Sequence, residues 1–181
     1  MSFEAKAVAN HLLDLAEVKG ESLTPMKLQK LAFFAHGWHL ALAHKPLIVG
    51  GVQAWKYGPV INSLYGEFKG FGKQGITRKA VDLRTTSENG SLRLEEYEPS
   101  LGDGKESDAD VKVAEAIIDR VFSLYGIYSG PQLSDMTHRE GTPWHKIRQA
   151  YPEDLPKRVT IPDEIIRQYF LAQLQTTKPV A

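Results

Sequence analysis

Residues 28–44 read LQKLAFFAHGWHLALAH, and this segment constrains the fold more than any other part of the chain. At helical spacing one stripe of the segment carries Leu28, Leu31, Ala35, Trp38 and Leu42. The remaining faces are also largely apolar, and a helix that is apolar on nearly every side is a buried one. We therefore predict that a helix over residues 25–44 forms the centre of the fold.

The same segment contains histidines, so a metal site has to be weighed against a structural role. His36 and His39 are three residues apart, which places them close together on a helix surface. A usable site needs at least a third ligand, and no carboxylate occurs between Glu21 and Glu67. We predict no metal site. The residues assigned to the structural core are Leu28, Leu31, Ala35, His36, Trp38 and Leu42.

Helix start signals recur along the chain. Ser2 and Thr24 are candidate N-caps, and Pro25 follows Thr24 at the first helical position. Gly58 and Pro59 suggest the start of a third helix, with its inward residues at Val60, Ile61, Leu64, Tyr65 and Phe68. Later helices are expected to begin near Ser107, Pro131, Thr142 and Pro162.

Residues 76–97 change character, because apolar and charged residues alternate on both sides of Asn89-Gly90, a dipeptide suited to a tight hairpin turn. The predicted fold class is mainly α: a compact bundle of about six to seven helices around the buried helix 25–44, with one small β-hairpin at about 79–96. Residues 1–175 are expected to form a single helical domain, and residues 176–181 a flexible tail.

Composition narrows the classes of function. The chain has 181 residues, a net charge of zero and no cysteine, which excludes disulfides and thiolate metal sites. No run reaches the roughly 18 apolar residues of a membrane span, and the N-terminus lacks the pattern of a signal peptide. We expect a cytoplasmic protein that does not contact a membrane.

Two segments could suggest catalysis or cofactor binding. GFGKQG at residues 70–75 has the glycine spacing of a dinucleotide-binding turn, but a helix precedes it and a strand-like run follows, which is the reverse of the required order. Ser134, Asp135 and His138 fall on one short helix and cannot easily form the in-line arrangement of a triad. We therefore predict no catalytic residues, no cofactor and no enzymatic activity.

Basic residues cluster in segment 69–84, where nucleic acid could make contact. The candidate contacts are Lys73, Arg78, Lys79 and Arg84. Acidic residues are even denser in segment 95–110, so the two segments are expected to neutralise each other. Because non-specific binding depends on several free cations, nucleic acid is not the expected main partner.

Aromatic residues gather at QAWKYGPV (53–60) and at GTPW (141–144). Trp55, Tyr57 and Trp144 could seal junctions between elements. They are also residue types that are enriched at binding hot spots. Both interpretations remain open at this stage.

Three segments in order identify the chain as similar to a known family. LTPMKLQKLAFFAHGWHLALAHKPLI, AWKYGPVINSLYGEF and LSDMTHREGTPW resemble the SocA-like Panacea antitoxin domain over residues 5–150. The matching positions outside the core, which are candidates for partner contact, are Gln29, Lys30, Trp55, Tyr57, Gly58, Pro59, Thr137, His138 and Trp144.

The resemblance implies a bacterial or phage-associated antitoxin whose partner is a cognate protein toxin, neutralised by direct contact. Two alternatives accompany it. One is an adaptor that delivers the toxin to the ClpXP protease, and the other is a nucleic-acid-binding regulator that uses segment 69–84. The chain departs from the family at Gly50-Gly51 and in the hairpin, and such variable segments are natural places for toxin specificity.

Overall fold

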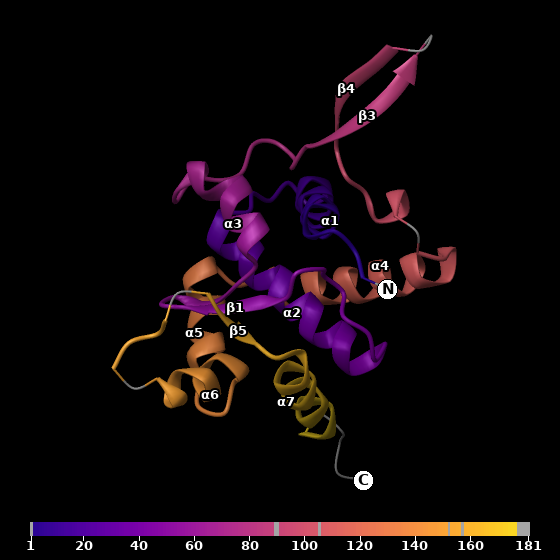
Figure 1. The fold of residues 1–181 in the computed structure, drawn as a ribbon. Coiled ribbons are helices and arrows are strands. Elements are labelled where there is room, and N and C mark those ends of the chain that lie inside the picture. The colour runs from indigo at the N-terminus through magenta and orange to yellow at the C-terminus, as the bar shows by residue number, and fades with distance from the viewer. Residues whose placement is uncertain (1, 89–90, 105, 152, 157, 177–181) are drawn as a thin grey trace.

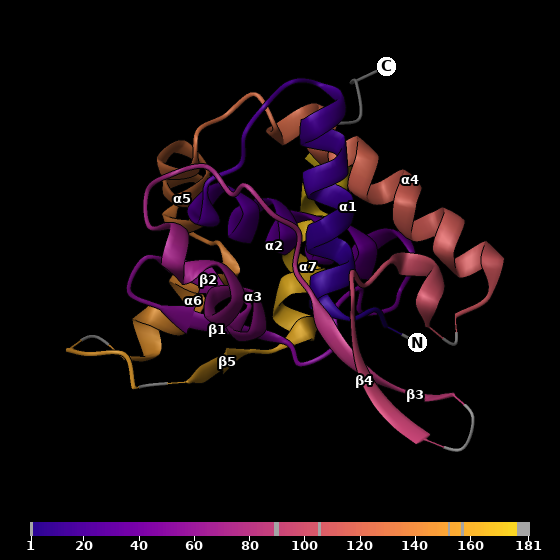
Figure 2. The same cartoon turned by 90° about the horizontal axis from the view of Figure 1, so that it is seen from above.

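A computed structural model describes residues 2–88, 91–104, 106–151, 153–156 and 158–176. Its centre is helix α2 (Pro25–Leu42), as predicted, and the structure is mainly helical. The helices packed around α2 are α1 (Ala5–Val18), α3 (Asn62–Phe68), α4 (Asp108–Tyr125), α5 (Gly130–His138) and α7 (Asp163–Thr176). In Figures 1 and 2, α4 and α7 lie on different sides of α2.

The packing of α2 explains its composition. Thr24 caps the helix, since its hydroxyl accepts a hydrogen bond from the Lys27 amide at 3.3 Å. Gly37 faces the Phe170 ring of α7 so closely that a Cβ there would collide with it, and the glycine lets the two helices approach. Among the predicted core residues, Leu28, Leu31, Ala35 and His36 have no exposed surface.

Two of the predicted core residues lie nearer the surface. Trp38 is half-buried, packs edge-on against Phe170, and donates from Nε1 to the Tyr125 hydroxyl at 3.2 Å. The assignment of Leu42 to the core is wrong, because its side chain is 51% exposed. Leu42 ends the helix, and His44 and Lys45 just beyond it are exposed as well.

A three-stranded antiparallel sheet covers one side of α2 and was not predicted. Its order is β2 (Gly58–Val60), β1 (Val52–Trp55) and β5 (Val159–Ile161). Trp55 pairs with Gly58, and Val52 pairs with Ile161 from the far end of the chain. The prediction of a helix from Gly58-Pro59 is therefore wrong. Those residues form a strand, and α3 begins only at Asn62.

Ser2 is not an N-cap either. The N-cap of α1 is Glu4, without a side-chain hydrogen bond, because the preceding residues pair with another segment. The Phe3 amide donates to the Leu47 carbonyl at 2.7 Å, and the Phe3 carbonyl accepts from Val49 at 2.9 Å. The predicted caps at Ser107 and Thr142 are confirmed, and they begin α4 and α6 (Pro143–Ala150) respectively.

The predicted hairpin is confirmed and consists of β3 (Asp82–Glu88) and β4 (Ser91–Tyr97). We call it the arm, since Figures 1 and 2 show it extending away from the helices. Its predicted turn at Asn89-Gly90 and residues 177–181 of the predicted tail lie outside the described residues. Short 3-10 helices, Lys69–Phe71 and Leu101–Asp103, stand before and after the arm. Among the described helices, none combines the length and apolar character needed to cross a membrane.

Candidate functional site

The segment from Trp55 to Pro59, which we call the Tyr57 turn, joins β1 to β2 and lies on a buried lysine. Lys30 on α2 is only 2% exposed. Its Nζ donates to the Tyr57 carbonyl at 2.7 Å and to the Pro59 carbonyl at 3.1 Å. One side chain of the central helix therefore holds the backbone on both sides of Gly58.

Gln29, the neighbour of Lys30, holds the chain just beyond the turn. Its amide nitrogen donates to the Ile61 carbonyl at 3.0 Å, while its amide oxygen accepts from the Ile61 backbone amide at 2.9 Å. This reciprocal pair satisfies both polar groups of a buried residue between a strand and a helix. Gln29 and Lys30 thus fix the path of residues 57–61.

Gly58 is the residue that lets the backbone lie this close to α2. Its φ is +100°, a region that residues with a Cβ rarely occupy. A Cβ built at this position would lie 2.5 Å from Lys30 Nζ and 2.7 Å from Thr137 Oγ1. The glycine is required both by conformation and by space.

Helix α5 supports the turn from the other side. Ser134 Oγ donates to the Tyr57 carbonyl at 3.2 Å, and Thr137 Oγ1 donates to the Ser134 carbonyl at 2.7 Å. His138 Nδ1 lies 2.6 Å from the same Ser134 carbonyl, which can only accept, so Nδ1 is the donor. Ser134, Thr137 and His138 thus form a polar support beneath Tyr57.

Trp144 on α6 completes the support. Its Nε1 donates to the Trp55 carbonyl at 2.7 Å, and its ring lies 4.1 Å from the His138 ring. Thr142, the cap of α6, donates to the Thr137 carbonyl at 2.8 Å, which ties α6 to α5. The family positions named from the sequence at Gln29, Lys30, Gly58, Thr137, His138 and Trp144 therefore converge on one turn.

Burial has an electrostatic consequence at Lys30. Its ammonium group has no carboxylate in its hydrogen bonds, only two carbonyl oxygens. Loss of hydration disfavours the charged form of a buried amine. Burial accordingly lowers the pKa of Lys30 from 10.5 to about 7.

While the backbone of the turn is held from below, its aromatic side chains face outward. Tyr57 is 65% exposed and Tyr65 is 44% exposed, and the Trp55 ring lies 4.8 Å from the Tyr65 ring. The prediction that Tyr65 points inward is therefore wrong. Leu64 and Phe68, four residues apart, share the buried face of α3, and Tyr65, one residue further round the helix from Leu64, lies on its exposed side.

These aromatic residues border a hollow of about 480 Å³, which we call the Tyr65 groove. Its lining is formed by Pro25, Met26, Gln29, Lys30, Trp55, Lys56, Tyr57, Val60, Leu64, Tyr65, Lys69 and Gly72. Apolar and aromatic side chains dominate the lining, with lysines around it. A rigid concave surface of this kind is typical of a site that receives a side chain of a partner.

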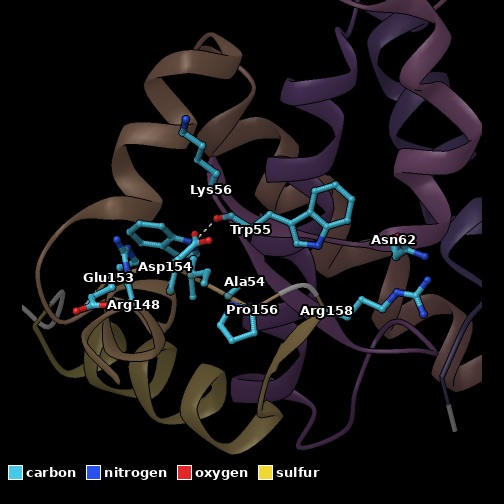
Figure 3. Close-up of a pocket in the computed structure, with 11 residues that line it drawn as sticks. Ala54, Trp55, Lys56, Asn62, Arg148, Glu153, Asp154, Pro156 and Arg158 are labelled. Carbon is cyan, nitrogen blue, oxygen red and sulfur yellow. Dashed lines mark hydrogen bonds between the residues drawn. The ribbon is translucent and has the colours of Figure 1, made fainter. Parts of the chain in front are cut away.

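A second hollow, of about 720 Å³, lies on the other side of Trp55 and Lys56, and we call it the Arg158 groove. It runs between β1, α6 and the segment that leads into β5, and Figure 3 shows Arg158 and Asn62 beyond the Trp55 indole and Arg148 at the opposite end. Trp55 and Lys56 line both grooves and so form a ridge between them.

The arm presents a different kind of surface. The strand register places Leu83, Leu92 and Leu94 on one face, where they are 59%, 77% and 73% exposed. The other face is satisfied within the arm, since Arg84 pairs with Glu95 at 3.2 Å and lies over the Tyr97 ring. The leucine face is thus an exposed apolar patch outside the Tyr57 turn.

The basic residues that the sequence proposed for nucleic-acid contact are mostly paired. Arg78 contacts Glu67 at 2.7 Å, and Lys79 lies between Asp14 at 2.5 Å and Glu98 at 3.6 Å. Lys73 is exposed, and it forms no ion pair with any described residue. With Arg84 paired to Glu95, the carboxylates around segment 69–84 offset most of its charge.

The two histidines of α2 are engaged in separate hydrogen bonds. His36 Nδ1 accepts from the Ile48 amide at 3.2 Å, so Nε2 carries the proton and donates to Asp163 at 3.1 Å. His39 Nδ1 donates to the Lys45 carbonyl at 2.7 Å, and burial lowers the pKa of His39. In the described part of the chain, no three His, Asp or Glu side chains are grouped as metal ligands.

Comparison with known proteins identifies the family of the chain. The family described as "Antitoxin SocA-like, Panacea domain" matches residues 28–145, a range that contains most of α2, the Tyr57 turn, α5 and the start of α6. The chain is 33% identical over 172 residues to a protein named Antitoxin SocA from Caulobacter vibrioides, and the alignment covers 95% of this chain and 85% of that protein. No solved structure matches the chain. The match to the family over most of the fold, including the residues that hold the Tyr57 turn, shows that the chain belongs to the SocA-like Panacea antitoxin family.

Proposed function

We propose that this protein neutralises a cognate protein toxin by direct contact, and that the surface around the Tyr57 turn makes that contact. Membership of an antitoxin family supports a toxin as the partner. The observation that carries the choice of surface is the contrast at Tyr57, whose carbonyl is held by Lys30 and Ser134 while its ring is 65% exposed.

Rigid support under an exposed aromatic residue favours binding for a physical reason. Association costs free energy when loops and side chains have to be ordered, and a turn that is already fixed avoids much of this cost. Tyrosine and tryptophan also bury a large area with few rotatable bonds, which is why they are frequent at hot spots. Tyr57, Tyr65 and Trp55 meet both conditions.

In this proposal the protein acts by occupying the toxin and performs no chemistry of its own. Ser134 and His138, two polar residues of α5 beneath the turn, are engaged with backbone carbonyls. Their role is to position the turn. The proposed setting is a bacterial or phage-associated toxin–antitoxin pair in the cytoplasm.

Co-expression tests this function. Each gene that neighbours the coding sequence is induced with and without this protein, and growth is scored. We expect one neighbouring gene to be toxic alone and harmless with this protein, and its product to co-purify with it. If no neighbouring product is both toxic and rescued, the proposed function is wrong.

Paired variants test the surface. Tyr57→Ala with Tyr65→Ala is expected to abolish rescue, because it removes two exposed rings from the contact. Ile127→Ala with Leu124→Ala is the matched control on the α4 side, since these residues are 76% and 45% exposed. Equal rescue by both double variants would place the contact elsewhere.

The adaptor alternative gives a different result in the same assay. Rescue by direct contact persists in cells that lack ClpXP, whereas rescue by delivery to that protease is lost there. The toxin's half-life in the two strains separates the mechanisms.

A further inference from the structure

The cations around the Tyr57 turn form no ion pair with a described carboxylate, unlike several cations elsewhere in the molecule. Lys6, Lys45, Lys79, Arg78 and Arg167 all form ion pairs. Within the described ranges, Lys56, Lys69 and Arg158 form none. Lys56 instead lies over the Tyr57 ring, with Nζ 5.6 Å from its centroid.

These cations stand beside apolar surface. Among the described residues that line the Tyr65 groove, none is acidic, whereas Lys56 and Lys69 are both present with the buried Lys30. Pro25, Met26, Val60, Leu64 and the aromatic residues supply the rest of the lining. A group that enters this groove therefore meets apolar walls and positive charge.

The Arg158 groove, on the other side of the ridge formed by Trp55 and Lys56, also carries positive charge. Its cations are Lys56, Arg148 and Arg158, and its acids are Glu153 and Asp154. In Figure 3 the acids lie near Arg148, while Arg158 stands apart beyond Trp55. Arg148 is further engaged with the Tyr151 carbonyl. The unpaired positive charge of both grooves thus flanks Trp55, in Lys56, Lys69 and Arg158.

We propose that the two grooves together bind an extended acidic segment of a protein partner, with an aromatic or aliphatic side chain of that segment seated in the Tyr65 groove. Carboxylates before and after the anchor side chain meet Lys69, Lys56 and Arg158 as the segment crosses the Trp55 ridge. This inference rests on the proposed function and specifies the chemistry of the partner's contact segment.

Charge complementarity and the apolar lining select this occupant together. Burial of an apolar side chain against aromatic walls is favourable, whereas burial of a phosphate group there costs free energy because the group loses its hydration. Cations at the rim that form no ion pair with the described residues gain Coulomb energy from an acidic segment without losing an existing ion pair. A nucleic acid would satisfy the cations but leave the apolar groove unfilled.

Selection from a displayed library of short random peptides tests the chemistry without requiring the toxin. The library is selected on the intact protein and counter-screened on Lys56→Glu with Lys69→Glu. We expect enriched peptides to carry several Asp or Glu residues around one aromatic or leucine residue. Their affinity should fall about tenfold or more on the charge-reversed variant and should weaken with added salt.

The matched control is Lys112→Glu with Arg120→Glu, two exposed α4 residues without an ion pair among the described residues. This variant makes the same change in net charge and should bind the peptides like the wild type. Circular dichroism melts verify that both variants fold. Enrichment without acidic residues, equal loss on both variants, or displacement of the peptides by a single-stranded oligonucleotide would overturn the proposal.

The two experiments separate the two claims. Growth rescue by the intact protein together with peptides of no acidic character would leave the antitoxin function standing and remove the acidic segment. If acidic peptides bind at the grooves but no neighbouring gene is toxic, the acidic segment would stand and the antitoxin function would be removed.

Discussion

The Tyr57 turn and the arm both expose large side chains, but they are held in opposite ways. The turn is short, and its backbone receives hydrogen bonds from Lys30, Ser134 and Trp144, on three different helices. The arm is long, its strands pair with each other and with no other described strand, and its leucines are exposed to solvent. A two-stranded hairpin alone is marginally stable in water. Exposed side chains can thus lie on a surface that the rest of the fold holds in place, as at the Tyr57 turn. They can also lie on a hairpin that is held by the pairing of its own two strands, as in the arm.

The arm is nevertheless well attached at its root. Asn10 on α1, only 3% exposed, donates to the Ala80 and Pro99 carbonyls at 3.0 Å each and accepts from the Ala80 amide at 2.8 Å. Lys6 donates to the Val81 carbonyl at 2.7 Å. The root is therefore built like the Tyr57 turn, with buried polar side chains on a helix, and only the outer part of the arm lacks support.

Gly58→Ala is the change expected to have the largest effect on this comparison. The Cβ would collide with Lys30 Nζ and Thr137 Oγ1 at an unfavourable φ, so we expect a loss of about 3 kcal/mol or more in the free energy of unfolding. Chemical denaturation measures it. Gly50→Ala is the control, because Gly50 has φ +89° and nothing within 4 Å of its Cβ position. A Gly58 variant no weaker than the Gly50 variant would contradict the close packing of the turn.

Lys30 makes the support of the turn depend on pH. Its pKa is about 7 in the folded protein and 10.5 as the reference value. Between these values the unfolded chain binds more protons, so stability rises with pH in this range. From pH 7 to pH 9 we expect a rise of about 2 kcal/mol, and Lys30→Met should remove it. Below pH 9, Tyr125 and Tyr169, whose pKa values burial raises, remain protonated.

Denaturation curves at several pH values, on the wild type and on two variants, measure this slope. Lys27→Met is the matched control, since Lys27 lies on the same helix but pairs with Glu21 at 3.5 Å near the surface. Parallel pH profiles for the wild type and Lys30→Met would show that Lys30 does not titrate in this window.

Much of the fold could be predicted from the sequence because it depends on local signals. Apolar residues all around segment 28–44 indicated a buried helix, and Thr24, Ser107 and Thr142 indicated helix starts at positions that the structure confirms. Alternation on either side of Asn89-Gly90 indicated the arm. Each of these features depends on residues that are close in sequence.

The three-stranded sheet could not be predicted in this way. β2 contains Gly58 and Pro59, residue types that are unfavourable in strands, and each of β2 and β5 has only three residues. The pairing of Val52 with Ile161 joins distant parts of the chain. The same non-local contacts decide the candidate site, because only the folded structure places Lys30 beneath Tyr57 and turns Tyr65 outward.

Asn10→Ala tests whether the root of the arm resembles the Tyr57 turn. The substitution leaves two carbonyls and one amide without their side-chain partner in a buried place, which typically costs about 1–3 kcal/mol. We expect a loss of about 2 kcal/mol in unfolding free energy, together with faster hydrogen exchange in β3 and β4. Asn62→Ala, at an exposed position that begins α3, is the control. An unchanged exchange rate in the arm would show that Asn10 does not hold it.

Leu92→Ser with Leu94→Ser is expected to have the smallest effect on the free energy of unfolding, and it tests directly whether the leucine face of the arm is unsupported. Both side chains are more than 70% exposed, so their removal uncovers little buried surface, and surface changes usually stay within about 0.5 kcal/mol. Leu28→Ser, at a fully buried position, is the opposite control and should unfold or severely destabilise the protein. If the double arm variant instead loses several kcal/mol in the free energy of unfolding, the leucine face must be packed against another molecule in solution. The contrast between the turn and the arm would then not hold, because both surfaces would be covered in an assembly. Sedimentation at several concentrations distinguishes that case, because a self-associating arm would make the mass of the wild type, but not of the variant, depend on concentration.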